Sequence, residues 1–319
     1  MTAEATGRRA IRAIDSIVNT AVLVLLMLFL AFAGYALWDA EQVYKAAERS
    51  NYTIYKPTAE NQGKSLKELQ AINPEVIAWL TVFGTNIDYP VTQGHDNMKY
   101  INTDAEGRYS YTGSIFLDFK NSKDFSDFNS ILYGHHMEKE AMFGEIGTFS
   151  KKDIFDSRKY GNLYFGEKDH GIEFFTFLHC DAYDSEVFNA NVKESMRQVY
   201  LDGILEKAML TRDIGVSVDD HIILLATCSA VSTNGRDILV GRITDEVYED
   251  GFLTRSIEGG KEPLSVSGPA GFFENIPALL LWLVLILAAL IALLSVIRHN
   301  KKMKQAEVKQ IDQQGDELD

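Results

Sequence analysis

Cysteine is scarce in this sequence, since only two occur among 319 residues, Cys180 and Cys228. Small exported domains that rely on disulfide bonds use many more for their size, so a disulfide scaffold is excluded. The fold must therefore be stabilised by a packed core, although the two cysteines could still pair with each other. No internal repeat is visible, so repeat architectures are not indicated.

Positive charge is also in short supply, with 31 lysines and arginines against 45 aspartates and glutamates and a net charge of −14. No basic patch interrupts the middle of the chain, so nucleic acid is not an expected partner. Metal-ligand spacing is missing as well, because four histidines stand isolated: His95, His170, His179 and His221. With neither a zinc pattern nor a calcium-type acidic cluster, we expect no cofactor.

Two long apolar segments dominate the hydropathy of the chain. Ser16–Trp38 and Asn275–Ile297 each contain 23 residues without a charge. At ~1.5 Å per residue, a helix of that length is ~35 Å long and crosses the ~30 Å of a hydrocarbon core. Positive residues flank both segments on their outer sides: Arg8, Arg9 and Arg12 before the first, and Arg298, Lys301, Lys302 and Lys304 after the second. This pattern predicts that both termini are cytoplasmic and that residues 39–274 lie on the other side of the membrane.

The expected organisation follows from these segments. It comprises a cytoplasmic N-terminus (1–15), a transmembrane helix (16–38), an extracellular linker with a short helix (39–64), a folded domain (65–250), a linker (251–274), a transmembrane helix (275–297) and a cytoplasmic basic, disordered tail (298–319). A cleavable signal peptide is the alternative for the first segment, because Ala31-Phe32-Ala33 resembles a cleavage site. We favour the anchor, because the apolar run continues to Trp38.

The folded domain is predicted to be mainly β. Its start, Ser65–Leu80, begins as a helix with Ser65 and Glu68 as a possible capping box. Eight short apolar runs follow, at spacings that suit a small barrel or sandwich: Ala78–Val82, Ile87–Val91, Ser114–Asp118, Ser130–Tyr133, Leu163–Phe165, Ile172–His179, Ile222–Ala226 and Ile238–Ile243. One insertion, Asp184–Asp213, has apolar residues at helical spacing and predicts one or two amphipathic helices packed on the sheet.

The most informative stretch is His221–Ile243. The run Ile222–Leu225 indicates a buried strand that leads to Cys228, and an Asn-Gly turn signal precedes a second run. If the two runs pair as a hairpin, Cys228 and Arg236 lie side by side at its open end. The unremarkable readings are a small buried thiol for Cys228 and a solvated side chain for Arg236. A reactive thiol, with an unperturbed pKa of ~8.5, needs a cationic neighbour such as this arginine. Cys180, in an aromatic-rich strand, is expected in the core.

A possible base lies upstream, in Tyr133-Gly134-His135-His136-Met137. In extended chain His135 and His136 point to opposite faces, so only one of them can face the site, and these residues alone do not decide which. A nucleophile, a base and an anion stabiliser are the parts of a cysteine acyl-transfer site. Asp237 should face away from Arg236 and is not an obvious third member.

Several ordered blocks within Leu66–Ile243 carry a family resemblance: Asn73–Trp79, Ile87–Val91, Gly113–Asp118, Tyr133–Met137 and Thr227–Cys228 with Arg236. The chain resembles the sortases, the membrane-anchored cysteine transpeptidases of Gram-positive bacteria, and is most similar to class B. The resemblance implies that His135 is the family's histidine, Cys228 its nucleophile and Arg236 its arginine. It also implies that residues 65–250 form an eight-stranded β-barrel with an N-terminal helix, flanked by two transmembrane helices. The helix in Asp184–Asp213 would be the class B insertion.

Two departures from the class B pattern matter. Some members have an aspartate two residues after the cysteine, whereas this chain has Ala230, so an acid-assisted triad is in doubt. A C-terminal membrane helix is more typical of class C, the pilin-polymerising sortases. However, no Asp-Pro-aromatic lid precedes the barrel here.

The sequence hypothesis is therefore a membrane-tethered transpeptidase. Its partners would be exported proteins with a C-terminal sorting motif and an amine acceptor, either a peptidoglycan precursor or a pilin lysine. The motif, LPXTG-like or NPQTN-like, and the choice between wall anchoring and pilus assembly are left open. The rivals are a hydrolytic cysteine protease and a non-catalytic membrane-bound binding domain with Cys180 and Cys228 in a disulfide.

N-terminal sequencing of the mature protein tests the membrane anchor. We expect the mature chain to retain Ser16–Trp38, because the apolar run extends beyond the signal-like site. A mature chain that begins just after Ala33 would show instead that the segment is a signal peptide.

Overall fold

A computed structural model describes residues 3–58, 63–228 and 234–252. The chain divides into two units, Met1–Pro263 and Leu264–Asp319, and the second lies wholly outside the described residues. Four sequence predictions also concern residues outside the described ranges: the second membrane segment at 275–297, the tail at 298–319, most of the linker at 251–274, and the role of Ala230.

The first apolar segment lies within one continuous helix, α1 (Ala3–Ala47). The sequence suggested a separate short helix after Trp38, but α1 continues through this stretch to Ala47. Within Ile14–Tyr55 an 18-residue window has a mean hydropathy of 2.5, and α1 is the one helix among the described residues that is long and apolar enough to cross a membrane. Only the first of the two predicted spans is therefore seen in the described part of the chain.

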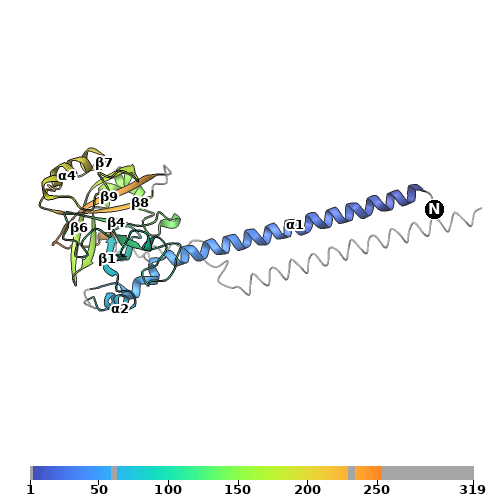
Figure 1. Ribbon diagram of the computed structural model, residues 1–319, viewed down its shortest axis with the longest axis horizontal. Helices are drawn as coiled ribbons and strands as arrows, with labels where there is room; N and C mark the ends of the chain where they lie inside the picture. The colour runs from blue at the N-terminus through green and yellow to red at the C-terminus, as the bar shows by residue number, and fades with distance from the viewer. Residues whose placement is uncertain (1–2, 59–62, 229–233, 253–319) are drawn as a thin grey trace, which may run out of the picture. The chain divides into compact units, whose positions relative to one another are not determined.

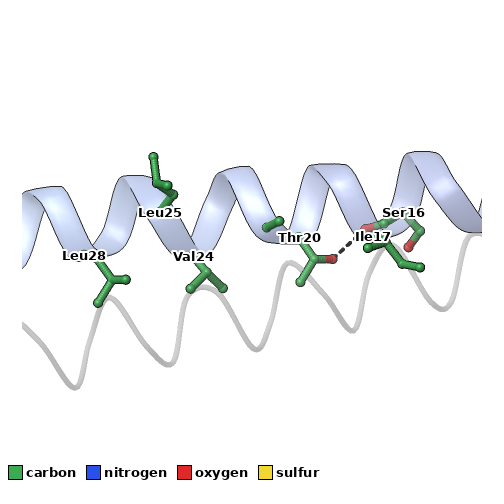
Figure 2. Close-up of a pocket in the computed structure, with 7 residues that line it drawn as sticks. Ser16, Ile17, Thr20, Val24, Leu25 and Leu28 are labelled. Carbon is green, nitrogen blue, oxygen red and sulfur yellow. Dashed lines mark hydrogen bonds between the residues drawn. The ribbon is translucent and has the colours of Figure 1, made fainter.

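One polar side chain of the apolar segment is satisfied within α1. The Thr20 hydroxyl donates to the carbonyl oxygen of Ser16, one turn earlier, at 2.7 Å (Figure 2). Val24 and Leu28 lie on the same side of the helix as Thr20 (Figure 2). This local bond lets a threonine occupy an apolar helix without an unpaired hydroxyl, which hydrocarbon would penalise.

Two short helices connect α1 to the barrel, η1 (Arg49–Tyr55) and α2 (Lys64–Ile72). The capping box expected at Ser65 and Glu68 is wrong. The residue that precedes α2 is Gly63, with a φ of 73°, and Ser65 instead donates its hydroxyl to the carbonyl oxygen of Lys56 at 2.8 Å. The left-handed backbone at Gly63 turns the chain into α2, a conformation that glycine adopts most readily.

The strands form one closed barrel, as expected. Their bounds are β1 (Val76–Val82), β2 (Asp88–Thr92), β3 (Ile115–Leu117), β4 (Asn129–Tyr133), β5 (Tyr160–Phe165), β6 (Lys168–Asp181), β7 (Ala208–Thr211), β8 (His221–Cys228) and β9 (Gly235–Thr244). The order is β5-β1-β2-β3-β4-β8-β9-β6, and a β5–β6 pairing closes this ring of eight strands. All eight predicted strands are present, and β7 adds a ninth strand on β6.

Short helical turns and two short α-helices connect the strands. They are η2 (Lys99–Ile101), η3 (Glu138–Glu140), η4 (Ile146–Ser150), α3 (Lys152–Ser157), η5 (Glu194–Met196) and α4 (Arg197–Glu206). Most neighbouring strands are antiparallel, but β2–β3 and β4–β8 are parallel. The parallel β4–β8 pair matters most below, because it brings the histidine segment to the cysteine strand.

The barrel strands are buried on both faces where the site lies, so two apolar clusters form. Alternate residues of β8 and β9, such as Leu225 and Leu239, join the larger cluster, which contains Trp79 and Phe177. The intervening residues of β8 and β9 join a second cluster, together with residues of β6 and α4. Its members include Leu178, Tyr200, Leu201, Ile204, Leu224, Ala226, Ile238 and Val240. Strand alternation therefore explains why β8 reads as a continuous apolar run.

The insertion before β8 is only partly helical. The sequence predicted a helical segment over Asp184–Asp213, but α4 covers only Arg197–Glu206, and β7 takes its end into the sheet. In Figure 1, α4 and β7 lie side by side. Tyr200 and Ile204 are buried as the helical spacing predicted. Three further members of that spacing, Met196, Val199 and Met209, are about half exposed. Met196 and Met209 lie outside α4, and Val199 lies on its exposed face.

The packing of α4 can be tested with two matched substitutions. Ile204 is 1% exposed and Val199 is 60% exposed. We expect Ile204→Ala to lower the free energy of unfolding by about 2–4 kcal/mol, because it leaves a cavity in the second cluster. Val199→Ala should change it by less than about 0.5 kcal/mol. Denaturant unfolding measures both, and equal effects would mean that α4 packs through another face.

Candidate active site

The predicted hairpin of cysteine and arginine is present. Strands β8 and β9 pair antiparallel from His221 opposite Ile243 to Cys228 opposite Arg236. Directly paired residues of antiparallel strands have Cα atoms about 5 Å apart and share a face of the sheet. The backbone thus places positions 228 and 236 side by side at the last described pair of the hairpin.

The histidine segment reaches the same end through parallel pairing. Strand β4 runs alongside β8, with Tyr133 opposite Ala226, and the backbone amide of Gly134 continues the ladder to the Ala226 carbonyl at 3.2 Å. The ladder ends there, and a continuation of the same register by two residues would set position 135 opposite position 228. In an extended chain, side chains two residues apart point to the same face, so position 135 would share the face of Tyr133 and position 136 would lie on the opposite face. The direction of the ladder therefore favours His135, the histidine that the family resemblance implied, over His136, a choice that the residues alone left open.

His135 is held by a backbone carbonyl. Its Nε2 atom lies 2.8 Å from the carbonyl oxygen of Ile101, at the end of η2. Because a carbonyl oxygen only accepts hydrogen bonds, this contact assigns the proton to Nε2 and leaves Nδ1 free to exchange a proton with a reacting group. The ring is half-buried, so it is partly open to solvent and to a bound molecule.

His136 has a different environment. It forms an isolated β-bridge with Met142, and its Nδ1 atom is buried with no hydrogen-bond partner among the described residues. We have no physical account of this unpaired nitrogen. The bridge joins His136 to the other end of the loop, at Met142.

Arg236 and Asp237 separate to opposite faces of β9. Arg236 is half-buried, and its Nη1 atom donates to the Gly235 carbonyl at 3.0 Å. Asp237 is buried and accepts from Nδ1 of His179 at 2.9 Å. The sequence expectation that Asp237 points away from Arg236 is confirmed. The Asp237–His179 pair lies on the face of the sheet that also carries Leu239 and the larger apolar cluster, and Asp237 packs there against Gly147.

The second cysteine lies on the far side of Arg236. Cys180 in β6 pairs with Arg236 in β9, and Cys228 pairs with Arg236 from β8. Two strand spacings, about 9.6 Å, separate the cysteine positions, which is more than a disulfide spans. Cys180 is a free, buried thiol, so the disulfide alternative is wrong. Burial raises the pKa of Cys180 to about 12, so this thiol stays neutral at physiological pH.

An aromatic and polar cluster borders the histidine segment. The Tyr133 ring lies 5.4 Å from Phe116 and 6.2 Å from Phe188, between centroids, and its hydroxyl donates to Oδ2 of Asp118 at 3.1 Å. Burial, with the Asp118 charge next in size, raises the pKa of Tyr133. Asp118 also accepts from the Asn97 amide at 2.8 Å. The carboxylate thus joins β4 to the segment before η2.

Sequence reasoning missed parts of this neighbourhood. Asn97 was not singled out, and Asp118 and Tyr133 were noted only as parts of family blocks. Tyr133 had one usable signal, since it stands two residues before His135 and so shares its face. The Ile101 carbonyl had none, because a backbone acceptor leaves no mark on residue type. Among the described residues, no group of three or more His, Cys, Asp or Glu side chains could hold a metal ion.

The chain is similar in sequence and structure to known proteins. No family model matches the chain. Sortase B of Staphylococcus aureus is 28% identical over 237 residues, which cover 70% of this chain and 96% of that protein. The crystal structure of sortase B from the type II pilus of Streptococcus pneumoniae is 44% identical, covers 56% of this chain and 98% of its own, and has a TM-score of 0.50. A Streptococcus pyogenes class B sortase involved in pilus biogenesis is 40% identical, covers 57% and 99%, and has a TM-score of 0.54.

The closed barrel, the cysteine hairpin and these relatives together define a cysteine transpeptidase. The chain belongs to class B of the sortase family. The resemblance seen in the sequence is confirmed at this level.

The two thiols should differ sharply in reactivity. We expect iodoacetamide at pH 8 to leave Cys180 of the native protein unmodified, because its pKa is about 12 and the side chain is 8% exposed. Peptide mass spectrometry, with a denatured sample as the positive control, measures the modification. Alkylation of Cys180 as fast as in the denatured sample would contradict its assignment to the core.

Proposed function

We propose that this protein cleaves a C-terminal sorting motif of exported proteins through a thioacyl-enzyme and transfers the acyl group to a pilin amine. Cys228 is the nucleophile, His135 the acid and base, and Arg236 the stabiliser of the oxyanion. One observation carries the proposal: the β4–β8 and β8–β9 registers, which support a meeting of these three positions at one end of the barrel. Membership of a transpeptidase family supports the reaction class.

The first half of the reaction forms the thioacyl-enzyme. The Cys228 thiolate attacks the carbonyl carbon of the scissile peptide bond, and a C–S bond forms as the oxygen becomes an oxyanion. Arg236 donates hydrogen bonds to that oxyanion, an interaction that strengthens only as charge develops. When the C–N bond breaks, the protonated Nδ1 of His135 gives its proton to the leaving amine.

The second half regenerates the enzyme. The acceptor amine attacks the thioester carbonyl carbon, and His135 takes the amine proton on Nδ1. A new amide bond forms as the C–S bond breaks and the Cys228 thiolate leaves. The Ile101 carbonyl, which holds Nε2–H throughout at 2.8 Å, favours the use of one nitrogen for both proton transfers.

Pilus assembly is the favoured setting. The two pilus-associated class B structures are 44% and 40% identical to this chain, against 28% for the Staphylococcus aureus enzyme. The acceptor is therefore proposed to be a lysine side chain of another pilin subunit. A peptidoglycan amine is the alternative that the experiment below separates.

The proposed topology follows the charge pattern of the chain. Helix α1 anchors the enzyme, the catalytic domain of residues 65–250 faces outward, and the second apolar segment at 275–297 returns the chain to the cytoplasm. One apolar helix among the described residues and the arginines before Ser16 support the anchor. An enzyme on the outer face would meet exported substrates as they emerge from the membrane.

Single substitutions test the assigned roles. We expect Cys228→Ala to abolish cleavage of a sorting-motif peptide, His135→Ala to lower kcat/KM by about 100- to 10,000-fold, and Arg236→Ala by about 100- to 1,000-fold. The matched control, Cys180→Ala, should retain activity because its thiol is inert in the core. Cleavage of a fluorogenic peptide, read for each variant at equal folded concentration, measures these effects.

The same assay identifies the acceptor. With a lysine-bearing pilin fragment or a peptidoglycan-type oligoglycine added, mass spectrometry of the products shows which amine is ligated. Ligation to the lysine supports pilus assembly, and ligation only to oligoglycine supports wall anchoring. Hydrolysis alone with both acceptors, or retained cleavage by Cys228→Ala, would overturn the proposed reaction.

A further inference from the structure

The loop that follows His135 has an unusual backbone. Residues 134–144, called the histidine loop here, contain three non-glycine residues in the left-handed region: Lys139 (φ 56°), Glu140 (φ 61°) and Met142 (φ 52°). Side chains disfavour this conformation, so it persists only where surrounding contacts hold it. The contacts that hold this loop therefore determine where its first residues lie.

One such contact comes from the far end of helix α1. Nζ of Lys139 lies 2.8 Å from Oε2 of Glu41 and 4.4 Å from the centroid of the Tyr44 ring. Glu41 and Tyr44 are three residues apart in α1 and so share a face of that helix. One lysine of the histidine loop thus binds both a carboxylate and an aromatic ring of the anchor helix.

A second contact is buried and passes through Tyr89 of β2. The Tyr89 hydroxyl donates to the carbonyl oxygen of Ala47, the last residue of α1, at 2.9 Å. The Tyr89 hydroxyl oxygen in turn accepts a hydrogen bond from the backbone amide of Met142 at 3.2 Å. Burial raises the pKa of Tyr89 to about 12, so the hydroxyl keeps its proton and makes both bonds at physiological pH. One fully paired hydroxyl therefore bridges the end of α1 and the histidine loop.

Another residue of the histidine loop, Phe143, contacts the backbone at His135. The amide of Phe143, next to Met142, donates to the His135 carbonyl at 3.0 Å. The buried Phe143 ring packs on the backbone of Gly134, where a Cβ atom would lie 2.7 Å from the ring. Phe143, the residue after Met142, thus contacts both His135 and the preceding Gly134.

We propose that the end of α1, Glu41–Ala47, positions the catalytic histidine of this enzyme through Lys139 and Tyr89. The inference rests on the proposed role of His135 and adds that the helix that anchors the enzyme also sets the geometry of its base. Lys139 and Tyr89 are positioning residues, since neither is assigned a contact with the reacting atoms. Small displacements of a catalytic group cost large factors in rate, up to about 100-fold for 1 Å.

Substitutions at the exposed contact test the proposal without endangering the fold. In the full-length protein in detergent micelles, we expect Lys139→Met and Glu41→Gln each to lower kcat for peptide transfer by about tenfold at unchanged KM. Lys139→Arg, which keeps the charge and the ring contact, should restore most of the rate. Because the two residues act through one contact, the double variant should lose no more than either single one.

A matched control uses another exposed ion pair. Nζ of Lys168 lies 2.6 Å from Oδ1 of Asp245, away from the histidine loop, so Lys168→Met should leave kcat unchanged. For the buried contact, Tyr89→Phe should lower kcat by about tenfold with KM unchanged. Thermal unfolding of each variant, together with thiol titration of the active fraction, separates lost positioning from lost folding.

The outcomes distinguish this inference from the proposed function. If His135→Ala is inactive while Lys139→Met, Glu41→Gln and Tyr89→Phe keep full kcat, the positioning proposal is wrong and the catalytic role of His135 stands. If His135→Ala keeps its activity, the role of His135 fails first. An equal loss in Lys168→Met, or a rise in KM in place of a fall in kcat, would also overturn the positioning proposal.

Discussion

The parallel pairing of β4 with β8 is the interaction on which the account depends. The two strands are far apart in the chain, so pairing them costs conformational entropy, which the backbone hydrogen bonds and the burial of the strands offset. Burial on both faces fixes its register, because a shift by one residue would turn the apolar side chains of each strand to the wrong cluster. This register directs the chain after β4 toward the end of β8, where the β8–β9 hairpin places position 236 beside position 228, and our proposal that position 135 meets them rests on it.

Much of the barrel could be predicted from the sequence, because eight apolar runs are bounded by turn residues and each became a strand. The failures have local causes. The end of the Asp184–Asp213 pattern entered β7 because a short amphipathic run fits either a helix or an edge strand. Ser65 found a better acceptor in the Lys56 carbonyl than in a capping box. Helix α1 continued to Ala47 because Glu41 and Ala47 gained partners in the domain.

The site divides in the same way. Chemistry alone selected Cys228, Arg236 and a pair of histidines, since a thiol nucleophile needs a base and a cation nearby. The residues alone did not separate His135 from His136; the family resemblance pointed to His135, and the register of a distant strand, which no local pattern encodes, gives the physical argument for it. The Ile101 carbonyl and the Tyr89 bridge leave even less trace in the sequence, because the first is a backbone atom and the Tyr89 hydroxyl contacts only backbone atoms. An enzyme of this kind therefore shows its reactive groups in its sequence and its positioning groups only in its fold.

Engineered disulfide formation tests the central claim most directly, because it reports the distance between two chosen positions. In a Cys180→Ala background, Cys228 is paired with a second cysteine at His135→Cys or at His136→Cys, and each protein is exposed to a mild oxidant. A disulfide needs Cα atoms within about 7 Å and side chains that face each other. The account predicts rapid loss of both free thiols in the His135→Cys protein and little loss in the His136→Cys protein. The reverse result, or no bond in either, would contradict it.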